Sequence, residues 1–224
     1  MRASPVVAEL VVHVLGDLGL AGGELGLLAT RAPVRASFLH RGAECSAAVR
    51  VLVHEAVLDG LVKRLAGAVS VLEVGQASDL EIDVPPVIEQ EAAERVARYA
   101  TVAEREGRSA AVAGEVPDGG WFVAPTVATE LPKDSAVLTE EILGPLPVVA
   151  RRVRRGGLRQ RRRLVLRPDR RPVRLQRGHG RRRRHHSPVG NLHVSCEITG
   201  AMVGRQSFDG NHLSGTGTKA GGPG

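Results

Sequence analysis

The chain has 224 residues, enough for one sizeable domain, and 42% of them are hydrophobic. Two cysteines are too few for a disulfide framework and no apolar run is long enough to span a membrane, which predicts a reducing, cytoplasmic setting with no membrane partner. The net charge of +7 has a local origin, because 17 arginines and one acid lie between Arg151 and His186, whereas the remaining residues carry a net charge of −9.

Residues 1–35 are apolar and rich in glycine. The run from Val6 to Val12 predicts a short strand or helix, and Gly22-Gly23 predicts a break after it. Nothing in this stretch has a chemical signature. We therefore treat residues 1–35 as a divergent segment before a main body at residues 36–150.

The main body opens on a thiol. Cys45 lies in the run Gly42-Ala43-Glu44-Cys45-Ser46-Ala47-Ala48, at a glycine-led bend before the strand-like run 49–54. A lone cysteine can be a small buried hydrophobe or a nucleophile, and taken alone this one fits burial better. The stretches that follow decide between the two interpretations.

Two helices and a strand are expected next. Apolar residues recur at helical spacing between Ala56 and Val69, which predicts a helix that covers a sheet. Pro85-Pro86 predicts the start of a second helix, which ends at Gly107. Its apolar face contains the residues Ile88, Ala92, Val96, Tyr99 and Ala103. Residues 114–127 predict a turn that leads into a strand, with Trp121 and Phe122 in packing positions.

The acidic pair Glu140-Glu141 precedes the run Ile142-Leu143-Gly144-Pro145. By itself such a pair is typical of a solvated helix end. The alternative is a binding role, because a carboxylate can accept hydrogen bonds from two hydroxyl groups at once.

Residues 151–188 form an arginine tract with no helical or strand period and no interleaved aromatic residues. We expect it to be disordered. An arginine-rich arm that folds on nucleic acid is one interpretation, since guanidinium groups bind phosphates and bases well. However, such arms commonly mix in lysine, and this tract has none.

Several stretches together resemble the aldehyde dehydrogenase family, and within it the enzymes that oxidise L-glutamate gamma-semialdehyde. The segment 38–54 resembles the active-site pattern G-Q-x-C-S/C-A, and 140–145 resembles E-E-I-F-G-P. In residues 189–224, the run 198–210 resembles I-T-G-A-x-V-G-x-Q-P-F-G-G, and 213–223 resembles S-G-T-G-x-K-A-G-G-P. The resemblance covers roughly 34–149 and 189–223.

The resemblance implies a fold and a reaction. The fold is the α/β catalytic domain of that family, incomplete and interrupted by the disordered arginine tract. The reaction is NAD-dependent oxidation of L-glutamate gamma-semialdehyde to L-glutamate, in proline degradation, through a thiohemiacetal on Cys45. The implied partners are the small aldehyde and, through leftover oligomer surfaces, a second copy or intact homologues. No metal is implied.

The resemblance also implies roles for single residues. Glu141 would hydrogen-bond the ribose next to nicotinamide, and Leu143 stands where the family has a phenylalanine beside that ring. Ser46 and the main-chain amides of Gly200 and Ala201 would anchor the α-carboxylate of the substrate, since small residues allow close approach to an anion. Phe208 would pack on the aliphatic part of the substrate.

Departures from the family pattern predict that this chain is inactive alone. Ala43-Glu44 replaces the usual Gln-Lys, which removes a cation beside the thiol. No phosphate-binding loop precedes Cys45, and the general-base glutamate and the oxyanion-hole asparagine of the family are not found either. We therefore expect a C-terminal remnant that produces no NADH by itself.

The resemblance suggests an origin for the arginine tract. Permitted codons for residues 158–173, read from the second base, spell S-A-N-D-D-D-S-S-Y-D-L-T-G-G-P, and the family carries A-N-D-T-x-Y-x-L-T-G-G at this place. Our hypothesis is a reading-frame change near Ala150 that is compensated near Pro188. The encoding DNA tests it, because AGA and AGG codons throughout the tract would contradict it.

Overall fold

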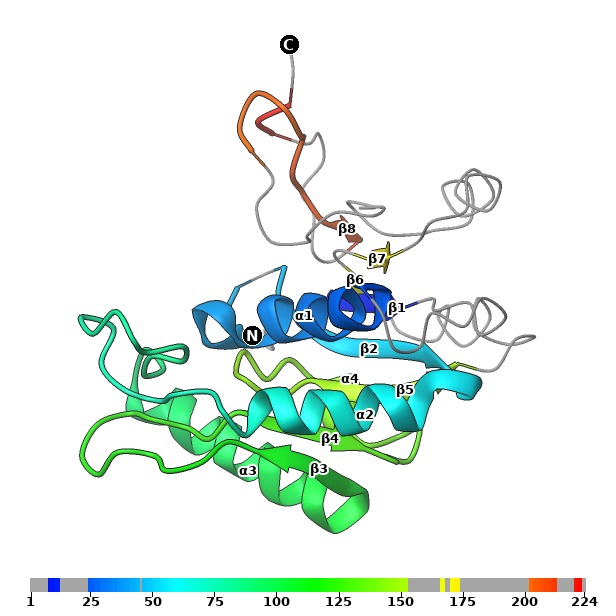
Figure 1. Ribbon diagram of the computed structural model, residues 1–224. Coiled ribbons are helices and arrows are strands. Elements are labelled where there is room, and N and C mark those ends of the chain that lie inside the picture. Colours follow the sequence, from blue (N-terminus) through cyan, green and yellow to red (C-terminus); the bar gives the residue numbers. More distant parts are fainter. Residues whose placement is uncertain are drawn as a thin grey trace, which may run out of the picture.

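The computed structural model describes residues 8–12, 24–44, 46–152, 166–167, 170–173, 202–212 and 220–222. Their main feature is a six-stranded sheet in the order β3-β4-β5-β2-β1-β7, parallel throughout except for β3, which is antiparallel to β4 (Figure 1). The strands of this sheet are β1 (Ala8–Val12), β2 (Ala48–His54), β3 (Arg108–Val112), β4 (Thr126–Thr129), β5 (Val148–Arg152) and β7 (Arg170–Val173). A parallel sheet of this kind needs apolar cover on both faces.

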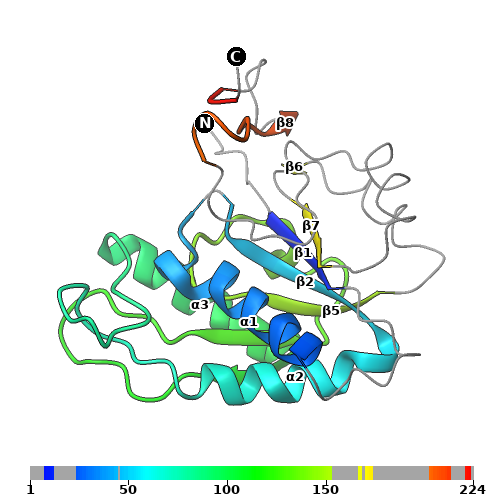
Figure 2. The same ribbon diagram turned by 45° about the horizontal axis from the view of Figure 1, so that its top comes forward.

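Helices supply that cover from two sides (Figure 2). They are α1 (Glu24–Phe38), α2 (Glu55–Val69), α3 (Gln90–Glu106) and α4 (Ala136–Thr139), with a short 3-10 helix, η3, at Leu39–Gly42. Residues of α1 and α2 share one hydrophobic cluster with β2, which we call the α1/α2 core. Residues of α3 and α4 form a second cluster, the α3/α4 core.

Neighbouring strand residues divide between these two cores. Val127 and Val149 belong to the α1/α2 core, whereas Ala128 and Val148, next to them in sequence, belong to the α3/α4 core. This division follows from the two-residue period of a strand, which turns successive side chains to opposite faces of the sheet. The pattern confirms the α/β fold expected from the sequence.

The two longer predicted helices are present, with one corrected start. α2 buries Leu61, Leu65 and Val69 at four-residue spacing, as expected. α3 begins at Gln90 rather than at the proline pair, and Ile88, expected on its apolar face, lies before the helix with 71% of its surface exposed. The backbone amide of Val87 instead donates to the Trp121 carbonyl at 2.8 Å, which holds this stretch in a loop.

The expected segment boundaries do not coincide with element ends. α1 runs through residues 35 and 36, and β5 runs through residues 150 and 151. Within the arginine tract, β7 pairs in parallel with β1, and β6 (Leu166–Arg167) pairs antiparallel with β8 (Asn211–His212). The expectation of a tract without strands is therefore wrong at residues 166–167 and 170–173, and the rest of residues 153–188 lies outside the described residues.

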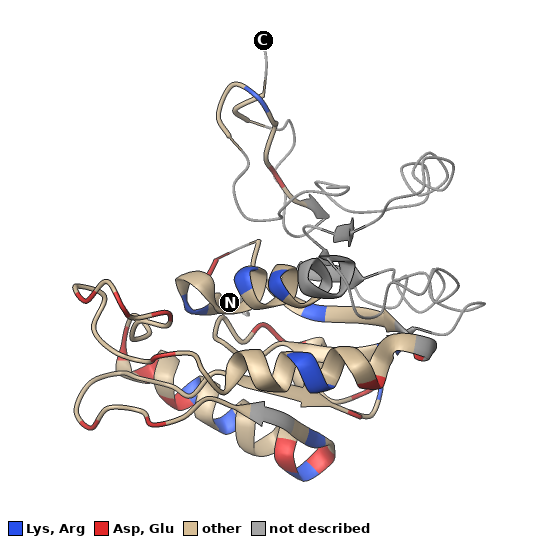
Figure 3. Ribbon diagram, in the orientation of Figure 1, with Lys and Arg blue, Asp and Glu red and all other residues tan. Residues whose placement is uncertain are grey.

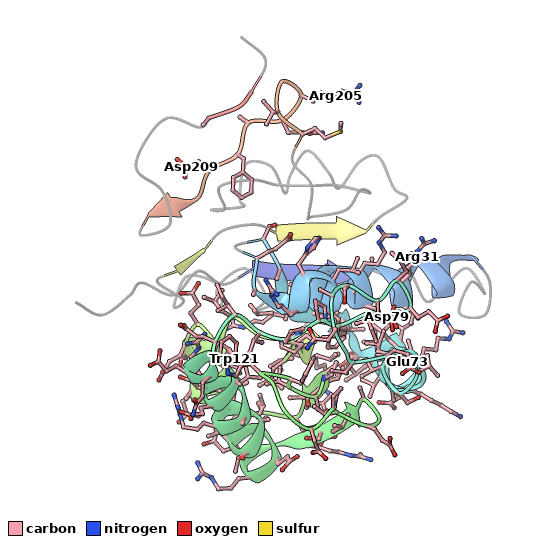
Figure 4. The ribbon with its side chains drawn as sticks, turned by 90° about the vertical axis from the view of Figure 1, so that its left-hand side faces the viewer. Arg31, Glu73, Asp79, Trp121, Arg205 and Asp209 are labelled. Atoms are coloured by element: carbon pink, nitrogen blue, oxygen red, sulfur yellow. The ribbon has the colours of Figure 1, made fainter. Side chains whose placement is uncertain are left out.

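Figure 3 marks the positions of charged residues along the ribbon, and among the described residues they occur on the helices and on the connecting loops. The loop between α2 and α3 carries exposed acids and no basic residue, namely Glu73, Asp79, Glu81, Asp83 and Glu89. In Figure 4, Glu73 and Asp79 lie on one side of the lower part of the view and Trp121 on the other, and all three are away from Arg205 and Asp209 above. Trp121 is 46% exposed and not packed in either core. None of the helices that the structure describes is long and apolar enough to cross a membrane.

Candidate active site

The chain makes a left-handed turn just before the cysteine segment. α1 ends at Phe38, which is 2% exposed, and η3 follows with positive φ angles at His40 (55°), Arg41 (56°) and Gly42 (65°). Two consecutive non-glycine residues in this region are uncommon and strained. Such conformations persist where the surrounding structure holds them, and they concentrate at functional sites.

Contacts on both sides of residue 45 fix the ends of the cysteine segment. Cys45 itself lies outside the described residues. Before it, the Ala43 amide donates to the His40 carbonyl at 3.1 Å, and His40 Nε2 lies 3.5 Å from Glu44 Oε1. After it, the Ala48 carbonyl accepts a hydrogen bond from Ser37 Oγ at 2.7 Å, where the chain enters β2.

Ser46 and the turn are covered by other parts of the chain. Ser46 is 6% exposed, so little of its surface is open to the substrate carboxylate that it is predicted to contact. Arg41 Nη1 donates to the Pro86 carbonyl at 2.9 Å, which ties the turn to the loop before α3. The turn is therefore held from two directions, although nothing so far assigns a role to Ser46.

Glu141 and Leu143, the predicted cofactor contacts, lie in the segment 140–146 between α4 and β5. Both are half-buried, whereas Ile142 between them is 3% exposed and packs in the α3/α4 core. Leu143 has a φ of 52°, another strained non-glycine position. The segment continues into the sheet, because the Thr126 amide at the start of β4 donates to the Pro145 carbonyl at 2.9 Å.

The turn and the segment 140–146 meet at two glycines. A Cβ atom built on Gly42 would lie 2.4 Å from the carbonyl oxygen of Gly144, which no real side chain tolerates. Gly42 also needs its positive φ, so glycine is required there on both counts. The structure thus brings together the two stretches from which the nucleophile and the cofactor contacts were predicted.

Helix α3 holds the segment 140–144 from the other side. Arg95 Nε donates to the Ile142 carbonyl at 2.9 Å, and the Tyr99 hydroxyl donates to Glu140 Oε2 at 2.5 Å. Burial, and then the bond to Glu140, raises the pKa of Tyr99 above its ordinary value. Sequence reasoning missed Arg95 and placed Tyr99 on the apolar face. The available signal was their i, i+4 spacing beside the buried positions Ala92 and Val96.

The remaining predicted site residues are described only in part. Gly200 and Ala201 lie outside the described residues. Phe208 is 38% exposed, and its backbone exchanges hydrogen bonds with Ala220, from N to O at 2.9 Å and in the reverse direction at 3.3 Å. No described contact joins Phe208 to Ser46, so the substrate-anchor roles stay predictions. Within the described ranges no three His, Cys, Asp or Glu side chains gather as metal ligands do.

Comparison with known proteins gives consistent matches. Residues 27–153 match the model of the aldehyde dehydrogenase family. A curated relative named 1-pyrroline-5-carboxylate dehydrogenase, from Bacillus cytotoxicus, is 32% identical over 209 residues, which are 88% of this chain and 38% of the relative. The chain therefore spans less than two fifths of the length of that relative.

Solved structures match over nearly the whole chain. A bifunctional proline utilization A (PutA) protein is 30% identical with a TM-score of 0.86, covering 98% of this chain and 21% of the other. A 1-pyrroline-5-carboxylate dehydrogenase from Thermus, solved with bound NAD, is 28% identical with a TM-score of 0.82, covering 98% of this chain and 41% of the other. These matches extend the sequence resemblance to the three-dimensional arrangement.

Proposed function

The chain belongs to the aldehyde dehydrogenase family, and we propose that it carries part of an active site for NAD-dependent oxidation of L-glutamate gamma-semialdehyde to L-glutamate. One observation carries the proposal: the turn before Cys45 packs directly on the segment of Glu141 and Leu143, at Gly42 and Gly144. A nucleophile and a cofactor must be neighbours in such a reaction. The names of the relatives supply the substrate class.

The residues of segment 140–146 fit the nicotinamide end of NAD. Glu141 and Leu143 keep part of their surface exposed while Ile142 between them is buried, so a carboxylate and an apolar side chain lie in the same short segment. The carboxylate suits a ribose diol, and the leucine suits the face of a ring. When bound, NAD would supply the hydride acceptor of the reaction.

The chain's own residues account for the covalent part of the reaction. The Cys45 thiolate would add to the aldehyde carbon, and the thioester formed after oxidation would be hydrolysed by water to the acid. Ser46, together with the amides of Gly200 and Ala201, would hold the α-carboxylate of the substrate, and Phe208 would cover its methylene groups. Glu44 stands where the family has a lysine, so the thiol of this chain lacks the neighbouring cation that would favour its thiolate.

Protection of Cys45 from alkylation tests the proposal without requiring turnover. The chain is treated with iodoacetamide, with and without L-glutamate gamma-semialdehyde, and the labelling of Cys45 and Cys196 is measured by peptide mass spectrometry. We expect the semialdehyde to slow labelling of Cys45 several-fold more than an equal concentration of propanal does. Labelling of Cys196 serves as the internal control.

Two outcomes would contradict the proposal. Equal protection by propanal would remove the substrate assignment, and equal labelling of Cys45 with and without either aldehyde would remove its role as nucleophile. The chain alone is expected to produce no NADH with the semialdehyde, and measurable NADH would refute its description as an inactive remnant.

The arginine tract does not lead us to propose nucleic-acid binding. Arg170–Val173 forms β7 and pairs with β1 in the same sheet as β2. A stretch used for sheet pairing is not an arm free to fold on phosphates. This placement favours a structural contribution of β7 over the nucleic-acid alternative.

A further inference from the structure

Three residues of α3 contact every second residue of the segment 140–144. Tyr99 bonds the carboxylate of Glu140, and Arg95 bonds the carbonyl of Ile142. Val96 fills the space at Gly144 so closely that a Cβ on that glycine would lie 2.2 Å from Val96 Cγ2. The contacts fall on residues 140, 142 and 144, and the residues between them are the two predicted cofactor contacts.

The two adjacent acids of this segment are in different situations. Glu140 is exposed, follows α4, and accepts the Tyr99 hydroxyl. Glu141, the next residue, is half-buried. It lies between the two residues to which α3 is bonded, Glu140 and Ile142. The bond from Tyr99 directs the Glu140 carboxylate toward α3. The helix-end interpretation therefore fits Glu140, an exposed acid directly after α4, but not the half-buried Glu141.

Arg95 uses a charged group on a main-chain carbonyl rather than on a carboxylate. A charge-assisted bond to a backbone atom fixes the path of the chain, not the rotamer of one side chain. The residue that follows Ile142, Leu143, has the strained φ of 52°. Such a conformation needs restraint on both sides, and Arg95 before it and the Val96–Gly144 contact after it provide that restraint.

We propose that Arg95 and Tyr99 are positioning residues for the cofactor, which hold segment 140–144 so that Glu141 and Leu143 meet the nicotinamide ribose and ring. This inference rests on the proposed function. It adds two residues that act through the backbone of the segment and do not touch the cofactor. Because Gly144 also abuts Gly42, the same restraint sets where the cofactor segment lies against the turn before Cys45.

The first measurement is backbone hydrogen exchange on the full chain. The informative amides are those of Leu146 and Thr126, because they donate to the carbonyls of Gly144 and Pro145 at 2.8 and 2.9 Å. We expect Arg95→Met to speed their exchange about tenfold and Tyr99→Phe about threefold, with amides of β2 unchanged. Arg98→Met, an equal loss of charge at an exposed position of the same helix, is the matched control and leaves all of them unchanged.

The second measurement is NADH affinity, from the increase in NADH fluorescence on titration with each variant. Arg95→Met and Tyr99→Phe are expected to weaken binding by the same factors by which they speed exchange. Glu141→Gln is expected to weaken binding about tenfold with no change in exchange, because it alters a contact and not the position of the segment. Arg95→Lys, which retains a donor, is expected to recover part of both effects.

The outcomes separate this inference from the proposed function. The positioning role would be overturned if Tyr99→Phe and Arg95→Met left both exchange and affinity unchanged. It would also be overturned if Arg95→Met sped exchange across the whole sheet while Tyr99→Phe had no local effect. If wild type bound NADH and Glu141→Gln made no difference to the affinity, the cofactor assignment itself would be overturned. Tyr99→Phe removes a single oxygen at a partly exposed position, so it decides the case if Arg95→Met does not fold.

Discussion

Each of the two faces of the central sheet is covered by helices, but the helices on the two faces contact different parts of the chain. On one face, α1 and α2 bury apolar side chains such as Phe38, Leu65 and Val69 against β2. On the other face, α3 also buries an apolar stripe, and in addition bonds a main-chain carbonyl and a carboxylate of the segment 140–144. The α1/α2 core is thus a source of stability, whereas α3 also holds the segment 140–144, which we propose contacts the cofactor.

The largest expected loss of stability comes from a substitution that removes packing from the α1/α2 core. Leu65 is 2% exposed, and Leu65→Ala should lower the free energy of unfolding by about 2–5 kcal/mol, since it loses buried methyl groups and leaves a cavity. Urea unfolding measures this loss. The matched control is Leu80→Ala, because Leu80 is fully exposed and its removal should change stability by less than about 0.5 kcal/mol. Similar losses for both leucines would contradict the described core.

An intermediate effect is expected where the second face meets the functional segment. Gly144→Ala should cost about 1–3 kcal/mol, because the new methyl group overlaps Val96. Shortening the neighbour with Val96→Ala should relieve that overlap, so the double variant should lose less stability than the sum of the single losses. A double-mutant cycle by urea unfolding measures the coupling, and strict additivity would show that the two residues are not in contact.

The smallest effect concerns one hydrogen bond and depends on pH. Tyr99→Phe should cost about 0.5–1 kcal/mol at pH 8, because the hydroxyl no longer bonds Glu140. Folding raises the pKa of Tyr99, so the contribution of the hydroxyl is complete below about pH 10 and is lost as the pH rises through the folded-state value. The wild type should therefore keep its advantage over the variant up to about pH 10 and lose it only at higher pH, as the raised pKa of Tyr99 is passed. A difference in urea midpoint that stays constant while Tyr99 ionises would contradict this.

Local pattern predicted much of the fold. The four-residue spacing that ends at Val69 fixed α2, and the stripe through Ala92, Val96 and Ala103 fixed most of α3. The start of α3 was wrong because the Val87 amide bonds the Trp121 carbonyl, a contact 34 residues away that no periodicity contains. Similarly, β7 in the arginine tract depends on pairing with a distant strand and not on the propensity of its own residues.

The candidate site was predictable as stretches but not as an arrangement. Resemblance identified the segment of Cys45 and that of Glu141, yet their meeting at Gly42 and Gly144 is a backbone contact between residues about a hundred positions apart. Arg95 was missed for a different reason. It flanks the apolar stripe of an amphipathic helix, where an arginine ordinarily faces solvent, and only its carbonyl acceptor distinguishes it from Arg98.

The pairing of β1 with both β2 and β7 has a consequence for synthesis on the ribosome. β1 can pair with β2 soon after residue 54 is made, but its other edge must wait for residues 170–173. At ordinary elongation rates this interval lasts roughly six to twenty-four seconds. During that time a strand of the sequence Ala-Glu-Leu-Val-Val presents unpaired amides and carbonyls to any neighbouring nascent chain. Slower translation of the arginine codons would lengthen this exposure, so yield of folded protein should depend on the supply of arginine tRNA.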